Sequence, residues 1–220
     1  MMTWRINESL RRLYFRSGLK RFPRQVEDSG VLFIHVPKAG GVSVSQALYG
    51  CEIGHRRAVD YLAANKELYS SLKKFSIVRH PLDRAYSAYN YLKKGGMPKY
   101  KADAEFSKFI NRFPSFDAFV FDWLSKPGKV NCYIHFLPQT HFVTDFSGKL
   151  LVDKLGKLEH LDALLAELQT DWRLDLQVEH LNASRTSDSG PAVCHETVQL
   201  LQSIYQSDYE SFGYETFTAI

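Results

Sequence analysis

Short apolar runs and stretches of helical periodicity alternate along the first half of the chain. Residues 31–36 and 75–79 are rich in β-branched and aromatic side chains, which predicts two buried strands. Apolar residues recur at helical spacing over 42–49, 58–72 and 82–94, which predicts helices there. The order of strand, helices, strand and helix is typical of a parallel sheet with crossover helices on its faces. The pattern therefore predicts an α/β fold.

The second half of the chain is mainly helical in pattern. Within residues 99–125, seven aromatic side chains between Phe106 and Trp123 recur at helical spacing, and Ser115 is placed to cap a helix inside this range. Such rings can form a platform for a sugar, but at this spacing they more often form a core, and we expect a core. Further along, the pattern predicts a hairpin of 142–143 with 150–152 and helices at 161–168 and 195–210.

The loop after the first predicted strand has the composition of an anion site. Residues 37–43 read Pro-Lys-Ala-Gly-Gly-Val-Ser and run directly into the helix at 42–49. Two glycines permit positive φ and a close backbone approach, so that several N–H groups and the helix N-terminus can face one anion. Lys38 adds a charge and Ser43 a hydroxyl. In the Walker motif the lysine follows the glycines, whereas here it precedes them, which argues against a nucleotide triphosphatase.

A second anion site is expected after the second predicted strand. Arg79 stands at the carboxyl end of that strand, and Pro81 suits the first turn of the helix that follows. Ser87 lies about two turns along this helix, so that its hydroxyl and the guanidinium of Arg79 could reach one phosphate. Ligands of parallel α/β sheets bind at the carboxyl ends of the strands, where both motifs fall.

Together the two motifs resemble those of sulfotransferases that use 3′-phosphoadenosine 5′-phosphosulfate (PAPS). The resemblance is to the carbohydrate branch, which includes heparan sulfate 2-O-sulfotransferase and small bacterial sulfotransferases, and it runs from about residue 31 to 214. It implies that Arg79 and Ser87 hold the 3′-phosphate, and that Val42 replaces the usual threonine of the family. It also implies that the 5′-phosphosulfate is held by the loop residues Lys38, Ala39, Gly40, Gly41, Val42 and Ser43.

The resemblance extends to the fold and to a later segment. It implies a three-layer, P-loop-like α/β domain with a central parallel sheet flanked by helices, spanning residues 25–220 as a single domain. The length of 220 residues fits one such domain. An Asn-x-Ser-basic segment closes over the nucleotide in the family, which makes Ser184 and Arg185 candidates for the 3′-phosphate edge, although such a polar cluster is also typical of a plain surface loop.

The net charge of +4 is concentrated near the N-terminus. Residues 1–24 hold seven Lys or Arg side chains against the single acidic Glu8, with apolar residues between them. This segment is either a peripheral contact with an anionic membrane surface or an amphipathic helix packed on the domain. There is no apolar run of membrane-spanning length and no signal-peptide pattern, and the three cysteines form no CxxC pair. We expect a cytoplasmic protein that binds no nucleic acid.

Sulfuryl transfer needs a group that takes the proton of the acceptor. We expect His55 to be this base, because Gly54-His55 matches a Gly-His pair that the family carries in this loop. His135, in a His-x-x-Pro-Gln segment, is the alternative, whereas His35 is expected to be structural. No histidine pair has the spacing of a metal site, so no metal is expected.

The sequence therefore predicts a PAPS-dependent sulfotransferase that acts on a hydroxyl of a carbohydrate-like acceptor. Lys38 and His55 are its expected catalytic residues, with Lys38 acting on the leaving phosphate. Two other functions remain open: a P-loop kinase, and a nucleotide-binding protein without turnover. The acceptor and the oligomeric state do not follow from the sequence.

Overall fold

A computed structural model describes residues 22–178 and 192–216 of the chain. These residues fall into two compact units. Unit 1 comprises the described residues up to Arg79 and those from Gln139 to 178, and unit 2 comprises His80–Pro138 and 192–216. Most of the basic segment 1–24 lies outside the described residues, as do Ser184 and Arg185, so that the predictions for them stay predictions. The expectation of a single domain over 25–220 also stays a prediction.

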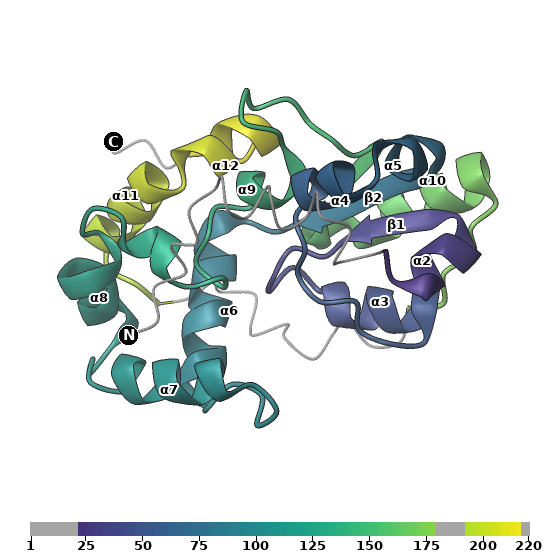
Figure 1. Ribbon diagram of the computed structural model, residues 1–220. Coiled ribbons are helices and arrows are strands. Elements are labelled where there is room, and N and C mark those ends of the chain that lie inside the picture. The colour runs from purple at the N-terminus through teal and green to yellow at the C-terminus, as the bar shows by residue number, and fades with distance from the viewer. Residues whose placement is uncertain (1–21, 179–191, 217–220) are drawn as a thin grey trace. The chain divides into compact units, whose positions relative to one another are not determined.

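Unit 1 is built on a three-stranded parallel sheet, with β1 (Val31–Ile34), β2 (Lys73–Val78) and β3 (Lys154–Lys157) in the order β1-β2-β3. Figure 1 shows β1 and β2 side by side, and Ile34 pairs with Ser76 in their register. Because all three strands are parallel, their carboxyl ends share one edge of the sheet. The predicted α/β class and parallel sheet are confirmed, and this edge is where the first two strands lead into the candidate site.

The helices of unit 1 follow the predicted order with differences in length. The range predicted as one helix, 58–72, is interrupted at Asn65, whose side chain accepts a hydrogen bond from Leu68 N and so starts a new helix. Helix 161–168 extends to Trp172, and the helix at Arg24–Ser29 was not predicted. The helices are α2 (Arg24–Ser29), α3 (Gly41–Tyr49), α4 (Ala58–Ala64), α5 (Lys66–Ser71), α9 (Thr140–Val143) and α10 (Leu161–Trp172), with a 3₁₀ turn η3 (Leu158–His160).

The hairpin expected around Ser147 and Gly148 is wrong in its strands. Residues 142–143 lie in the short helix α9, because Thr144 N donates to Thr140 O at 2.9 Å and closes a helical turn instead of a strand ladder. What remains of the hairpin is an isolated antiparallel bridge between Thr144 and Leu150, with a turn at Gly148 (φ 84°).

Helix α3 is fastened to the edge strand β1 by one tyrosine. The Tyr49 hydroxyl accepts a hydrogen bond from Phe33 N at 2.8 Å and donates to Val31 O at 2.9 Å. These are backbone groups of an edge strand, which an adjacent strand would otherwise satisfy. Burial raises the pKa of the Tyr49 phenol well above its ordinary value, so that the hydroxyl keeps its proton and its donor role. The last residue of α3 is therefore tied to the strand from which the loop leaves.

Unit 2 is helical in its described residues. Helix α6 begins with a proline in its first turn, as predicted, and the Ser115 side chain caps α8 by accepting from Ala118 N at 3.1 Å, also as predicted. The predicted helix 195–210 is interrupted at Tyr205. The elements are α6 (Pro81–Lys93), α7 (Lys101–Ile110), α8 (Phe116–Phe119), a π-helix η1 (Val120–Leu124), a 3₁₀ helix η2 (Lys129–Cys132), α11 (His195–Ile204) and α12 (Gln206–Phe212).

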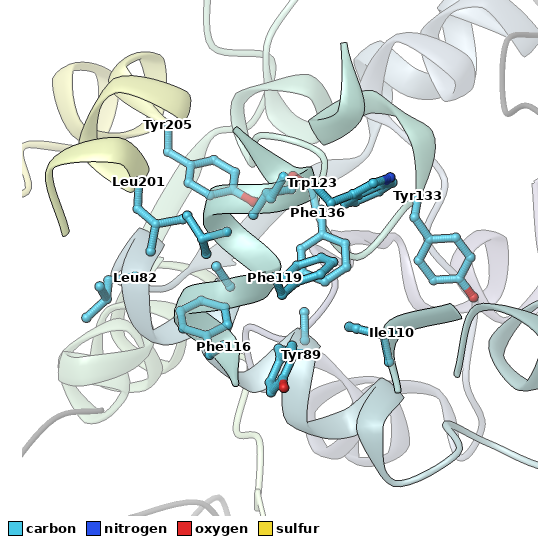
Figure 2. Packing of buried hydrophobic residues seen from close by; sticks show 14 of the residues in the cluster. Leu82, Tyr89, Ile110, Phe116, Phe119, Trp123, Tyr133, Phe136, Leu201 and Tyr205 are labelled. Atoms are coloured by element: carbon cyan, nitrogen blue, oxygen red, sulfur yellow. Dashed lines mark hydrogen bonds between the residues drawn. The ribbon is translucent and has the colours of Figure 1, made fainter. Parts of the chain in front are cut away.

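Most of the aromatic side chains between Phe106 and Trp123 belong to a core in unit 2. Phe116, Phe119 and Trp123 are buried, and Figure 2 shows Phe119 packed among Tyr89 and its other labelled neighbours. Phe119 and Trp123 are stacked with ring centroids 5.3 Å apart. The expectation of a core rather than a sugar platform is confirmed, which removes these rings from the candidate site.

Candidate functional site

The predicted phosphate loop is a turn between the end of β1 and the start of α3. Gly40, with φ 76°, is the residue at which the helix begins, and it has no side chain with which to cap the first turn. The backbone N–H groups at the start of a helix have no acceptor within the helix, so those of α3 can face an anion. The Ala39 N–H closes the turn by donating to Val36 O at 3.4 Å.

Lys38 has an unusual backbone conformation at the centre of this turn. Its φ is 65°, and among the described residues Arg173 is the other non-glycine residue with positive φ. A side chain in this region costs about 1 kcal/mol or more, and such residues are often found at functional sites. Lys38 and Ser43 are half-buried, whereas Val42 is 51% exposed.

Gly41 is a glycine for a different reason than Gly40. A Cβ atom placed on Gly41 would lie 2.1 Å from Cδ2 and 2.4 Å from Nε2 of His35, far inside contact distance. Its φ is not in the left-handed region. His35 directly follows β1, is 3% exposed, and stacks on Phe33 with ring centroids 5.7 Å apart. This contact between His35 and the first residue of α3 could not be predicted from the local sequence pattern.

His55 lies against His35 in the same unit. Its Nδ1 is 3.1 Å from the backbone carbonyl oxygen of His35, and the two rings meet edge to face with centroids 4.2 Å apart. A carbonyl oxygen only accepts hydrogen bonds, so Nδ1 carries the proton. In the neutral ring Nε2 then has the lone pair, which is the tautomer that a general base requires there. The structure therefore brings the predicted base against His35, whose ring in turn lies against Gly41.

Arg79 immediately follows β2 at the carboxyl edge of the sheet. The fully buried Gln139 side chain holds its backbone from both sides: Arg79 N donates to Oε1 at 2.9 Å, and Nε2 donates to Arg79 O at 2.8 Å. Gln139 is the last residue of the His-x-x-Pro-Gln segment noted in the sequence, which gave no indication of this role for its side chain. Ser87, half-buried on α6, belongs to unit 2, whereas Arg79 belongs to unit 1.

The alternative base, His135, is part of a buried network in unit 2. Its Nε2 lies 3.7 Å from Oδ1 of Asp103. The Tyr133 hydroxyl donates to Oδ1 of the same carboxylate, and the Tyr91 hydroxyl donates to Oδ2. Burial by itself would raise the pKa of Asp103, but hydrogen bonds from His135, Tyr133 and Tyr91 outweigh it and hold the pKa below its ordinary 3.8. A buried carboxylate with this set of donors indicates a structural role for the network.

One cavity of about 320 Å³ opens beside the segment that carries His55. Arg57 and Asp60 contribute to it from the start of α4, where their buried side chains pair at 3.1 Å. Its wall also contains the exposed ring of Phe146, and its full lining is Arg57, Val59, Asp60, Leu62, Ala63, Asp145 and Phe146. All these residues belong to unit 1.

Two searches of the described residues bear on cofactors and membranes. Over 22–178 and 192–216, no cluster of three or more His, Cys, Asp or Glu side chains is arranged to hold a metal ion. None of the helices in this part of the chain is both long and apolar enough to cross a membrane.

Comparison with known families identifies most of the chain. The family model described as "Sulfotransferase family" matches residues 24–215, which include the whole described part from α2 to α12. The chain therefore belongs to the sulfotransferase family. No curated protein and no solved structure matches it.

Proposed function

We propose that this member of the sulfotransferase family transfers a sulfuryl group from PAPS to a hydroxyl of a carbohydrate-like acceptor. The observation that carries the proposal is the loop between β1 and α3. It holds a lysine before two glycines and opens a helix of nine residues at the carboxyl edge of a parallel sheet. Anionic groups bind at such helix starts, and the family match covers the whole loop.

In this proposal the loop residues bind the 5′-phosphosulfate. The N–H groups from Gly40 to Ser43 and the ammonium of Lys38 stabilise negative charge that develops on the leaving phosphate. The acceptor oxygen forms a bond to sulfur as the bond from sulfur to the bridging phosphate oxygen breaks, which leaves 3′-phosphoadenosine 5′-phosphate (PAP). The side chain of Ala39 is buried, so this residue contributes through its backbone.

His55 takes the proton of the acceptor hydroxyl at Nε2. The hydrogen bond from Nδ1 to the His35 carbonyl supports this role, because it fixes the tautomer in which Nε2 can accept. The position of His135 in the Asp103 network supports His55 over the alternative.

Arg79 and Ser87 bind the 3′-phosphate, and Ser184 and Arg185 contribute to the same edge. The support for Arg79 is its place at the carboxyl end of β2 with its backbone held by Gln139. The same proposal includes a similarity to heparan sulfate 2-O-sulfotransferase and a single three-layer, P-loop-like domain over residues 25–220. It also includes a cytoplasmic location with membrane contact through residues 1–24.

Two rival functions make different predictions for ligand binding. A P-loop kinase would bind ATP with Mg²⁺, and a nucleotide-binding protein without turnover would bind PAP but transfer nothing. Val42 keeps the second rival open, because valine has no hydroxyl to offer at this position of the loop.

The test is thermal unfolding of the full chain with PAP and, separately, with ATP and Mg²⁺. We expect PAP to raise the melting temperature, since a ligand that binds only the folded state stabilises it. Stabilisation by ATP with Mg²⁺ alone would overturn the proposal. Transfer of ³⁵S from labelled PAPS onto a panel of glycans then separates an enzyme from a protein that only binds nucleotide.

A further inference from the structure

The His35 ring contacts three parts of the candidate site at once. It stacks on Phe33, meets His55 edge to face, and lies directly over Gly41 at the start of α3. His35 is 3% exposed, so the ring is in a fixed packing environment. Its main-chain carbonyl oxygen is also the acceptor for Nδ1 of His55. One residue thus contacts both the phosphate loop and the expected base.

The contact with Gly41 is a steric requirement of the histidine ring. Gly41 is the first residue of α3, and its φ is not positive, so its backbone would accept an alanine without strain. Alanine is also the best helix former. The atoms that exclude a Cβ at this position are Cδ2, Nε2 and Cγ of His35, all within 2.8 Å of it. The ring therefore determines how closely α3 approaches the end of β1.

We propose that His35 is a positioning residue that sets the base His55 and the N-terminus of α3 in a fixed relation to each other. Its ring holds the His55 ring in the orientation from which Nδ1 donates to the His35 carbonyl, and it thereby fixes the tautomer with the proton on Nδ1. The proposal rests on the proposed function, in which the start of α3 binds the phosphosulfate and His55 accepts the proton. A fixed relation matters because misplacement by about 1 Å can cost about a hundredfold in rate.

A plain core histidine would pack in the same way but would leave His55 unaffected when replaced. If His35 is a positioning residue, removal of its ring should instead allow the His55 ring more than one orientation and both tautomers. His35→Ala removes the ring and keeps the main-chain carbonyl, whereas His35→Phe keeps a flat ring in its place. The two variants therefore separate the effect of steric packing by the ring from the effect of its two nitrogen atoms.

The steric part of the proposal is tested with a double-mutant cycle of His35→Ala and Gly41→Ala. We expect Gly41→Ala alone to lower the melting temperature and to weaken PAP binding by about tenfold or more, a loss of about 1.4 kcal/mol of binding free energy. In the His35→Ala background the same change should alter PAP affinity by less than about threefold. Equal effects of Gly41→Ala in both backgrounds would overturn the proposal.

The positioning part is read from the His55 ring itself. A long-range ¹H–¹⁵N spectrum of the full chain with ¹⁵N-labelled histidine reports which ring nitrogen is protonated, and His55→Asn identifies the His55 signals. We expect the Nδ1–H tautomer in the wild type and in His35→Phe, and a mixture of both tautomers in His35→Ala. A wild-type tautomer in His35→Ala would overturn the proposal.

Turnover provides the functional measurement. We expect His35→Ala to lower kcat by about tenfold to a hundredfold, and His35→Phe to recover most of that loss. If the wild type neither binds PAP nor transfers sulfate, the proposed function fails. The positioning role is then still tested by the His55 tautomer in the spectra and by the melting temperatures of the four proteins in the double-mutant cycle. If the wild type transfers sulfate and His35→Ala has unchanged kcat, the positioning role alone fails.

Discussion

Replacement of His55 by asparagine separates its chemistry from its structural contact. The Nδ2–H₂ group of asparagine lies close to the position of the imidazole Nδ1, so that it can still donate to the His35 carbonyl, which is 3.1 Å from Nδ1 in the native chain. Asparagine has no group that accepts a proton at neutral pH. His55→Asn therefore keeps the hydrogen bond and removes the base, whereas His55→Ala removes both.

The magnitudes follow from these two differences. A hydrogen bond of this kind contributes about 0.5–1.5 kcal/mol, so His55→Ala should be about 1 kcal/mol less stable than His55→Asn in denaturant unfolding. Loss of a general base costs about 10²–10⁴ in rate, and both variants should lose kcat on this scale. PAP affinity should stay within about threefold of wild type, a difference of about 0.6 kcal/mol.

Single-turnover transfer of ³⁵S and calorimetric titration with PAP measure the two quantities separately. A variant that keeps more than about a tenth of wild-type kcat would refute His55 as the base. A variant with normal chemistry but PAP binding weakened more than about tenfold would instead place His55 in the nucleotide site.

Three further predictions concern the donor site and the buried network. Arg79→Ala should weaken PAP binding about tenfold to a hundredfold in titration calorimetry, and Ser87→Ala less, because charged hydrogen bonds contribute about 1.5–3 kcal/mol; equal affinity of wild type for adenosine 5′-phosphosulfate and PAPS would contradict this. Lys38→Gly should relieve the strain of a side chain at positive φ and stabilise the fold by up to about 1 kcal/mol, and it should also lower PAP affinity. The matched Arg173→Gly should change stability alone. Asp103→Asn should cost about 3 kcal/mol in urea unfolding. Because the folded pKa of Asp103 lies below 3.8, its stabilisation is present above pH 4 or so and is lost in wild type as pH falls further, a loss that the asparagine variant should lack.

The elements that the sequence predicted well are those that local pattern determines. The apolar run of β1 is buried at every position, and the helix after it ends at Gly50, which has φ 68°. The strand β3 could not be found in this way, because Lys154–Lys157 is short and its side chains are only half-buried. Gly156 is specified there by a contact: a Cβ would lie 2.6 Å from Leu164 Cδ2, an atom of α10.

The candidate site was predictable in its motifs but not in its contacts. The loop and the Gly54-His55 pair are visible in the sequence, since each is a local pattern. The hydrogen bond from His55 to His35 joins residues 20 positions apart, and the two between Arg79 and Gln139 join residues 60 positions apart. A single sequence carries no signal for such pairs, so that the role of Gln139 follows from packing alone.

The partners of the two candidate histidines explain why they differ as bases. A general base must change its charge during each turnover without rearranging its surroundings. The carbonyl of His35 accepts the Nδ1 proton of His55 both in the neutral ring and in the protonated ring, so this hydrogen bond persists through proton uptake. His135 instead faces the carboxylate of Asp103 at 3.7 Å, a partner that favours the charged ring, and both side chains are buried. Proton release from His135 would therefore leave the buried Asp103 carboxylate with one charged partner fewer, whereas proton release from His55 leaves its hydrogen bond to the His35 carbonyl unchanged.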